Sequence, residues 1–149
     1  MPPNLTRRRF VKGAAASVAV PYLISGSVLA AGTAPSNRIG LGAIGLGARN
    51  SSGRLATGGN AQVTAVCDVV KAKREATQKR IGKGCKAYND FRDLIADPNV
   101  DAVVIATPEH WHVLPAVMAA KAGKDAYVEK PLGLTIQEGR VLGDTFHRL

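Results

Sequence analysis

The sequence of 149 residues is poor in cysteine and in aromatic residues. It has two cysteines, Cys67 and Cys85, and phenylalanine, tyrosine and tryptophan together make up 5% of the chain. The spacing of the two cysteines matches neither a redox CxxC pair nor a metal site. We therefore predict no metal centre and two free thiols that are buried or half-buried.

The shortage of aromatic residues also affects how the net charge of +9 is interpreted. Four basic residues lie in the first twelve positions, which leaves an excess of about +5 for the rest of the chain. Most of that excess lies in one stretch with helical spacing and no interleaved aromatic residue: Lys71, Lys73, Arg74, Lys79, Arg80, Lys83 and Lys86. A solvated helix face is the preferred interpretation, so we expect no nucleic-acid partner.

The N-terminal segment has the layout of an export signal. Residues Thr6 to Lys12 read TRRRFVK and precede an uncharged stretch, Gly13 to Ala34, that is rich in small and apolar residues. The basic segment resembles the twin-arginine motif. We predict a signal peptide over residues 1–31, cleaved after Ala30 or Ala31, which engages the twin-arginine translocase and directs the protein to the periplasm.

Membrane contact is expected only through this segment. Gly13, Pro21 and Gly26 interrupt its apolar part, which disfavours a permanent span. An uncleaved membrane anchor is the alternative. Residues 32–37 are then a linker, and residues 38–149 form the folded domain.

Strand and helix patterns alternate along that domain. Five strands are predicted, at Arg38 to Ile44, Gln62 to Asp68, Cys85 to Tyr88, Val100 to Ala106 and Asp125 to Glu129. The fourth is almost continuously apolar, as expected for a strand covered on both faces of a parallel sheet. Short loops and right-handed crossovers favour an α/β fold with a doubly wound, Rossmann-type parallel sheet in the order 3-2-1-4-5.

The helices between these strands are predicted from apolar spacing and end signals. A weak helix runs from about Ser51 to Thr57, a polar one from Lys71 to Ile81, and a short one includes Phe91, Leu94 and Ile95. The next helix has Pro115 in its first turn, ends before Gly123, and carries Val113, Leu114, Val117 and Met118 on one face. Thr135 to Glu138 has the form of a capping box that opens the last helix, whose inner face is Ile136, Leu142 and Phe146.

The predicted sheet also separates the two cysteines. Cys67 closes the second strand at one edge of the sheet, whereas Cys85 opens the third strand at the opposite edge. A disulfide requires Cα atoms within about 7 Å of each other. We therefore predict that the two thiols do not pair.

A glycine-rich turn follows the first strand. Gly45, Gly47 and Ala48 occupy it, where backbone N–H groups and a helix N-terminus can approach a pyrophosphate. The string from Gly40 to Gly45 also satisfies G-x-G-x-x-G, but it falls inside the strand, where it could not cradle a phosphate. In the accepted register Asn50 replaces the third glycine, so the pattern alone is equally compatible with an ordinary turn.

Asp68 strengthens the nucleotide interpretation. It stands 23 positions after Gly45 at the carboxyl end of the second strand, where a carboxylate can accept hydrogen bonds from both adenosine ribose hydroxyls. A carboxylate here repels a 2′-phosphate and so favours NAD, although nearby Lys71, Lys73 and Arg74 keep NADP possible. The alternative is an aspartate that only forms a turn and caps the next helix.

Two later segments carry a family resemblance. They are Ala106 to His112 (ATPEHWH) and Tyr127 to Leu132 (YVEKPL). Together with the glycine turn and the Cys-Asp strand end, they make residues 38–149 resemble the Gfo/Idh/MocA family of glucose-fructose oxidoreductases and inositol dehydrogenases. The resemblance implies an oxidoreductase that transfers hydride between NAD(P) and a sugar, polyol or related hydroxy compound.

The resemblance also implies roles for individual residues. Glu129 would hold the nicotinamide-side ribose, and Lys130 would be the catalytic residue beside the nicotinamide ring and the substrate hydroxyl. Thr107 and Pro108 would border the cofactor between strands one and four. Without its position after the fifth strand, the Glu-Lys-Pro tripeptide would be an ordinary surface turn.

Three neighbouring residues are candidates for the lining of the active site. His112 is placed there by the resemblance, with capping of the following helix as its alternative. For His110 and Trp111, packing and lining of the cleft are equally compatible with the sequence.

The length departs from the family pattern. Family members continue into a sixth strand and an α/β substrate domain, which we expect this sequence to lack. An NAD-dependent glycoside hydrolase of the same family is one alternative function, and a truncated nucleotide-binding fragment without catalysis is another. We expect the chain alone to bind NAD weakly and to be inactive.

The export signal makes a direct prediction. Replacing Arg7 and Arg8 together by lysine should leave a reporter fused to the leader in the cytoplasm, because the twin-arginine pair is the feature that the translocase recognises. Cell fractionation measures the location of the reporter. Unchanged export of the double variant would contradict the twin-arginine interpretation.

Overall fold

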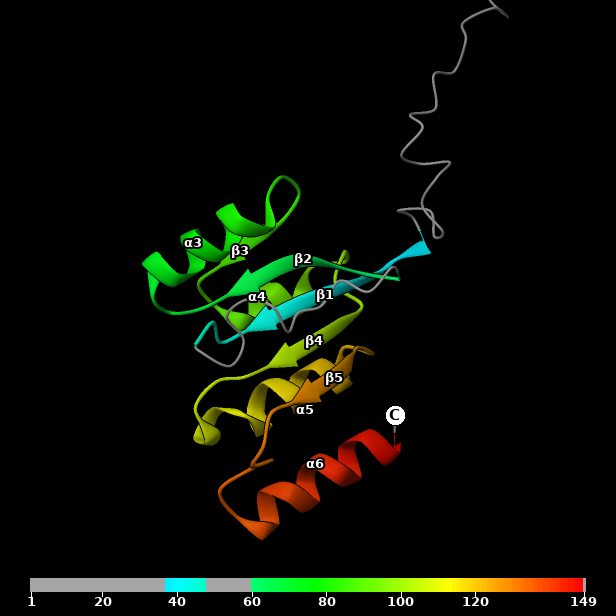
Figure 1. Ribbon diagram of the computed structural model, residues 1–149. Coiled ribbons are helices and arrows are strands. Elements are labelled where there is room, and N and C mark those ends of the chain that lie inside the picture. Colours follow the sequence, from blue (N-terminus) through cyan, green and yellow to red (C-terminus); the bar gives the residue numbers. More distant parts are fainter. Residues whose placement is uncertain (1–36, 48–59, 149) are drawn as a thin grey trace, which may run out of the picture. The chain divides into compact units, whose positions relative to one another are not determined.

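The computed structural model describes residues 37–47 and 60–148. Its core is a parallel five-stranded sheet in the predicted order, β3-β2-β1-β4-β5 (Figure 1). The strands are β1 (Ile39–Ile44), β2 (Ala61–Cys67), β3 (Lys86–Tyr88), β4 (Ala102–Ile105) and β5 (Asp125–Val128). The predicted leader, the weak helix from Ser51 to Thr57, and Ala48 and Asn50 lie outside the described residues.

Helices follow the strands as the sequence predicts. They are α3 (Lys71–Ile81), α4 (Phe91–Ala96), the 3₁₀ turn η2 (Glu109–Trp111), α5 (Val113–Lys121) and α6 (Ile136–Arg148). Gly123, with φ of 71°, follows the end of α5 in the left-handed conformation that terminates helices. None of the helices in residues 37–47 and 60–148 combines the length and the apolar character needed to cross a membrane.

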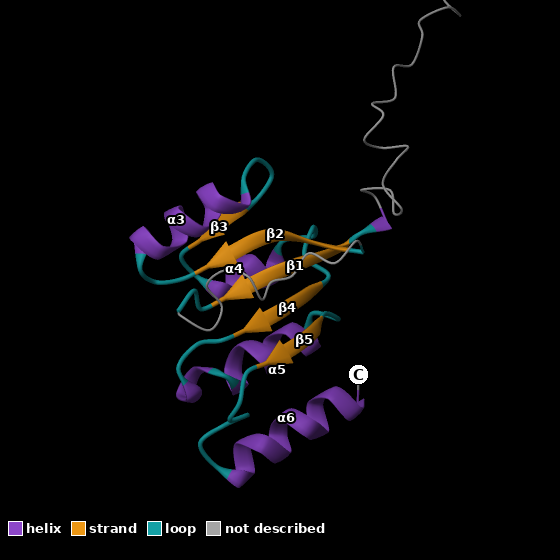
Figure 2. Ribbon diagram, viewed as in Figure 1, coloured by secondary structure: helices purple, strands orange, loops and turns teal. Residues whose placement is uncertain are grey.

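Each face of the sheet packs its own hydrophobic cluster. One cluster joins β1, β2 and β4 to α4, α5 and α6, with Leu94, Ile105 and Ala116 fully buried at its centre. Figure 2 shows α4 and α5 behind the strands on this face. The other cluster lies on the opposite face, where Val66 packs with Cys85 and Ile81. Hydrophobic clusters therefore lie on both faces of the sheet, as the doubly wound prediction requires.

Both cysteines are buried and free, as predicted. Burial is the main cause that raises the pKa of Cys67 to about 12. Burial also raises the pKa of Cys85 to about 11. Because the thiolate is the reactive form of cysteine, neither side chain is a nucleophile at neutral pH.

The last helix confirms one prediction and corrects another. The capping box is present: Thr135 Oγ1 accepts a hydrogen bond from Glu138 N at 3.2 Å, and Glu138 Oε2 accepts one from Thr135 N at 3.0 Å. The predicted inner face is wrong, because Leu142 is buried but Ile136 is 82% exposed and Phe146 is exposed. Figure 1 shows the reason, since α6 lies beyond β5 at the margin of the sheet and packs mainly on α5.

The predicted apolar face of α5 also needs correction. Of the predicted residues, Val113, Val117 and Met118 are half-buried and pack against the core, but Leu114 is exposed. The fully buried side of the helix consists of Pro115, Ala116, Ala119 and Ala120. Small side chains let the helix approach the sheet closely, so the most deeply buried part of the interface lies over the alanines.

A polar network closes the amino-terminal edge of the sheet. The buried Asp97 carboxylate accepts hydrogen bonds from the Tyr88 hydroxyl at 2.8 Å and from Asn99 N at 3.0 Å, and it lies 2.9 Å from Lys86 Nζ. Burial raises the pKa of Asp97. The hydrogen bonds from Asn99, Lys86 and Tyr88 together lower this pKa by more, so it lies well below its usual range. The network therefore holds the start of β3 against the loop that leads to β4.

Asp97→Asn should lower the free energy of unfolding by about 2 kcal/mol at pH 7, because the buried acceptors of Lys86 and Tyr88 are lost. The folded-state pKa of Asp97 is depressed, so its stabilisation is present above the unfolded value of about 4 and is lost as pH falls toward the folded value. Urea unfolding at pH 7 and pH 3 measures both effects. Asp93→Asn, at an exposed acid on α4, is the matched control, and equal effects of the two substitutions would contradict the network.

Candidate nucleotide-binding cleft

The glycine turn lies where the central strand ends. Gly45 has φ of 82°, and its N–H donates to Cys67 O at 2.9 Å, while Ala106 N donates to Ile44 O at 2.9 Å. A Cβ on Gly45 would lie 2.8 Å from backbone atoms of Ala106 and Thr107. Only glycine fits this close passage between the ends of β2 and β4.

Gly47 is constrained differently. A Cβ at this position would meet no atom of the described residues within 4 Å. The open space in front of the turn fits a cradle in which backbone groups approach a ligand directly. The rejected glycine register is indeed inside β1, which spans Ile39–Ile44 and pairs with strands on both sides.

Asp68 joins the turn to the second strand. Its Oδ2 accepts a hydrogen bond from Leu46 N at 2.7 Å, and its Oδ1 accepts one from Val70 N at 2.8 Å. The second bond closes a local turn just before α3. The turn-forming role that we considered as the alternative is therefore one of the roles of this side chain. A carboxylate has about four acceptor sites, so both oxygens retain capacity for ligand hydroxyls.

The three cations near Asp68 are not equivalent. Arg74 donates to Asp68 O at 2.6 Å and to Asn89 Oδ1 at 3.0 Å, and Lys71 lies 3.7 Å from the Glu75 carboxylate. Lys73 lines the cleft. Of the cations that keep NADP possible, Lys73 is therefore the one that faces the ligand space.

The loop after β4 carries Thr107 and Pro108 into the short turn η2. Thr107 Oγ1 donates to Trp111 O at 3.0 Å, and Trp111 N donates to Pro108 O at 2.8 Å, so the loop is tied to the turn at both ends. The Trp111 ring meets Phe91 edge to face, with centroids 6.2 Å apart, and lies 6.4 Å from the His110 ring. Trp111 therefore both packs against Phe91 and lines the cleft.

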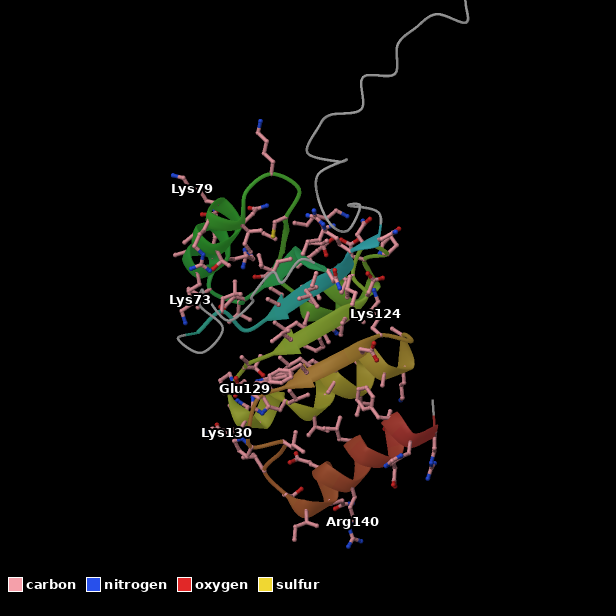
Figure 3. All side chains as sticks on the ribbon, turned by 45° about the vertical axis from the view of Figure 1, so that its right-hand side comes forward. Lys73, Lys79, Lys124, Glu129, Lys130 and Arg140 are labelled. Carbon is pink, nitrogen blue, oxygen red and sulfur yellow. The ribbon has the colours of Figure 1, made fainter. Side chains whose placement is uncertain are left out.

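Glu129 and Lys130 follow β5 at the same edge. Glu129 N donates to Ile105 O at 2.9 Å, which extends the pairing of β4 with β5 by one residue. Figure 3 shows Glu129 and Lys130 next to each other at this end of the sheet, with Lys124 at the other end. Glu129 is half-buried and Lys130 is exposed, and both line the cleft.

His112 is 2% exposed and occupies the position before α5, but its side chain makes no capping bond. The ring lies between two backbone carbonyl groups, with Nδ1 2.6 Å from Pro131 O and Nε2 2.7 Å from Thr107 O. The capping alternative is therefore wrong, and His112 connects the loops that follow β4 and β5.

These residues surround one cleft of about 600 Å³ along the carboxyl edge of the sheet. It brings together the predicted residues Gly45, Gly47, Asp68, Thr107, Pro108, His110, Trp111, His112, Glu129 and Lys130. Sequence reasoning missed Asn89 and Phe91, which also line it; their place just after the third strand is the signal that could have identified them. No group of three histidine, cysteine or acidic side chains in the described part of the chain could hold a metal ion.

The two turn glycines differ in a way that can be measured. Gly45→Ala should destabilise the fold by about 1–3 kcal/mol, because alanine at this φ is strained and its Cβ meets backbone. Gly47→Ala, the matched control, should change stability by less than about 0.5 kcal/mol because its Cβ has open space. Denaturant unfolding compares them, and equal losses of stability would show that the turn geometry is wrong.

Comparison with known proteins agrees with this geometry. The family described as "Oxidoreductase family, NAD-binding Rossmann fold" (Gfo/Idh/MocA) matches residues 39–149. An inositol 2-dehydrogenase/D-chiro-inositol 3-dehydrogenase of Lactiplantibacillus plantarum is 39% identical over 79 residues, covering 53% of this chain and 23% of the relative. A glycosyl hydrolase family 109 protein of a Shewanella species is 39% identical over 115 residues, covering 72% of this chain and 25% of the relative.

A solved structure shows the same arrangement. The scyllo-inositol dehydrogenase of Lactobacillus casei with bound NAD(H) and scyllo-inositol is similar with a TM-score of 0.69 and 27% identity, over 74% of this chain and 33% of that one. The chain thus spans about a quarter of the curated relatives named above and a third of this structure. The sheet order, the cleft at its carboxyl edge and the family match lead to one conclusion: this chain belongs to the Gfo/Idh/MocA oxidoreductase family and comprises its NAD-binding Rossmann domain.

Proposed function

We propose that the chain supplies the cofactor half of an exported oxidoreductase that transfers hydride between NAD and a sugar, polyol or related hydroxy compound. The observation that carries the proposal is the single cleft in which Gly45, Asp68, Glu129 and Lys130 meet. Relatives named as inositol dehydrogenases support the substrate class.

Asp68 and the glycine turn would bind the adenosine end of the cofactor. The oxygens of Asp68 already accept Leu46 N and Val70 N, which fixes the carboxylate at the mouth of the turn. From there it can accept both ribose hydroxyls and repel a 2′-phosphate, so NAD is the proposed cofactor. Lys73, which lines the cleft, is the feature that leaves room for NADP.

Glu129 and Lys130 would act at the nicotinamide end. The cofactor supplies the hydride acceptor and donor when it is bound. Glu129, fixed by its backbone bond to Ile105, would hold the ribose. Lys130 would hydrogen-bond the reacting oxygen and assist its proton transfer, while Thr107, Pro108, His110 and Trp111 would border the ring and the substrate.

Export by the twin-arginine route is part of the proposal and is supported by the TRRRFVK segment. That route carries folded proteins, which suits an enzyme that must acquire its nucleotide in the cytoplasm. The periplasm would then be its place of action, with membrane contact through the leader alone.

A second candidate function is an NAD-dependent glycoside hydrolase, and the match to glycosyl hydrolase family 109 proteins favours it. Such an enzyme would pass a hydride from a sugar carbon to NAD, eliminate the aglycone, add water in its place and return the hydride, so that NAD is regenerated. Absorbance at 340 nm separates the two functions. Net NADH formation from a free sugar or polyol supports the dehydrogenase, whereas release of the aglycone without net NADH supports the hydrolase.

Two substitutions test the proposed roles in a longer protein that contains this domain. Asp68→Ala should weaken NAD binding by about 1–3 kcal/mol through loss of charged hydrogen bonds, and NADP binding less or not at all. Lys130→Ala should lower kcat far more than NAD affinity, because its role is at the reacting oxygen. Calorimetric binding and initial rates give the two numbers, and a Lys130→Ala enzyme with undiminished turnover would overturn the mechanism.

A further inference from the structure

His112 makes contacts that neither capping nor ordinary core packing requires. Its ring is buried beneath the cleft, and each nitrogen lies within hydrogen-bond distance of a carbonyl oxygen from a different loop. A carbonyl oxygen can only accept, so each ring nitrogen must donate to make the contact favourable. A neutral imidazole carries one N–H, whereas the imidazolium carries two.

The protonated ring is therefore the form that completes both hydrogen bonds. When one nitrogen is deprotonated, its lone pair faces a carbonyl oxygen at 2.6 or 2.7 Å, and that contact becomes repulsive. Hydrogen bonds with an ionised donor are shorter and roughly twice as strong as neutral ones. The 2.7 Å distance at Nε2 lies at the short end of the N–H···O range and the 2.6 Å distance at Nδ1 lies just below it, which agrees with this form.

The two carbonyl groups belong to the loops that carry the proposed nicotinamide contacts. Thr107 follows β4, and Pro131 comes directly after Glu129 and Lys130. The backbone bond from Glu129 N to Ile105 O joins these segments at the sheet itself. His112 joins them again farther from the sheet and so sets the position of Lys130 relative to Thr107.

We infer that His112 is a positioning residue whose protonated ring holds the Thr107 and Glu129–Pro131 loops at the spacing that binds the nicotinamide half of NAD. This inference rests on the proposed function, which places that half of the cofactor between these loops. Its consequence is that NAD affinity depends on the two hydrogen bonds of this ring: without them the loops lose the contact that fixes their spacing.

The test measures the NAD affinity of the 149-residue chain by calorimetry. His112→Phe keeps a buried ring but removes both donors. It should raise the Kd for NAD about tenfold, since a factor of ten corresponds to about one hydrogen bond. His147→Phe, at an exposed histidine on α6, is the matched control and should retain the wild-type affinity.

The outcomes distinguish the inference from the proposed function on which it rests. If the wild-type chain binds NAD and His112→Phe binds it with the same affinity, the bridge is wrong and the proposed function stands. If the wild-type chain binds no NAD, both fail. Ring ¹⁵N signals of the wild-type chain with NAD added are a readout that a merely structural role would not move, and they decide also where His112→Phe does not fold: two N–H groups on His112 support the bridge, and a single N–H overturns it.

Discussion

The parallel register of the sheet is the constraint on which the cleft depends. Ile44 pairs with Cys67 on one side and with Ile105 on the other, and Ile105 pairs with Val128. These four residues are the last of their strands, so the strands end level with one another. The residues that follow them therefore emerge at one edge: Gly45, Asp68, Ala106 and Glu129. A slip of one residue in any strand would reverse its side chains and break up this edge.

The two edges of the sheet use polar side chains in different ways. At the amino-terminal edge they bond to the protein itself: Asp101 accepts Gly40 N at 2.6 Å, and Lys124 Nζ donates to the carbonyl groups of Asp97 and Val100. At the carboxyl edge, Lys73, Glu129 and Lys130 line the cleft. Stability and ligand recognition are thus carried by opposite ends of the same strands, and substitutions at one end should leave the other largely unaffected.

Features of the fold that are encoded by local periodicity and by the residues at the ends of helices and strands could be predicted from the sequence. The strand order, the limits of α3, the Thr135 capping box and the clustering of Asp68 with Gly45 all follow from such patterns. What it could not predict depends on tertiary packing. Ile136 and Leu114 have the right spacing for a buried face. However, α6 packs mainly on α5, and the most deeply buried side of α5 is formed largely by alanines, so both residues are exposed. His112 reaches Pro131, which lies 19 residues later in the sequence, and no short-range pattern encodes that contact.

The matches constrain the reaction more than the substrate. The same stretch of chain resembles proteins named as inositol 2-dehydrogenases and as glycosyl hydrolase family 109 proteins. In the proposed function, Asp68 and Glu129 would hold the two riboses, which are the same in every NAD enzyme, and Lys130 would contact an oxygen, which every hydroxy substrate has. Under that proposal these residues would support hydride transfer at a C–OH group without recognising the rest of the substrate. Net oxidation and transient oxidation share that step, so what separates them must act on the fate of the oxidised sugar rather than on the binding of NAD.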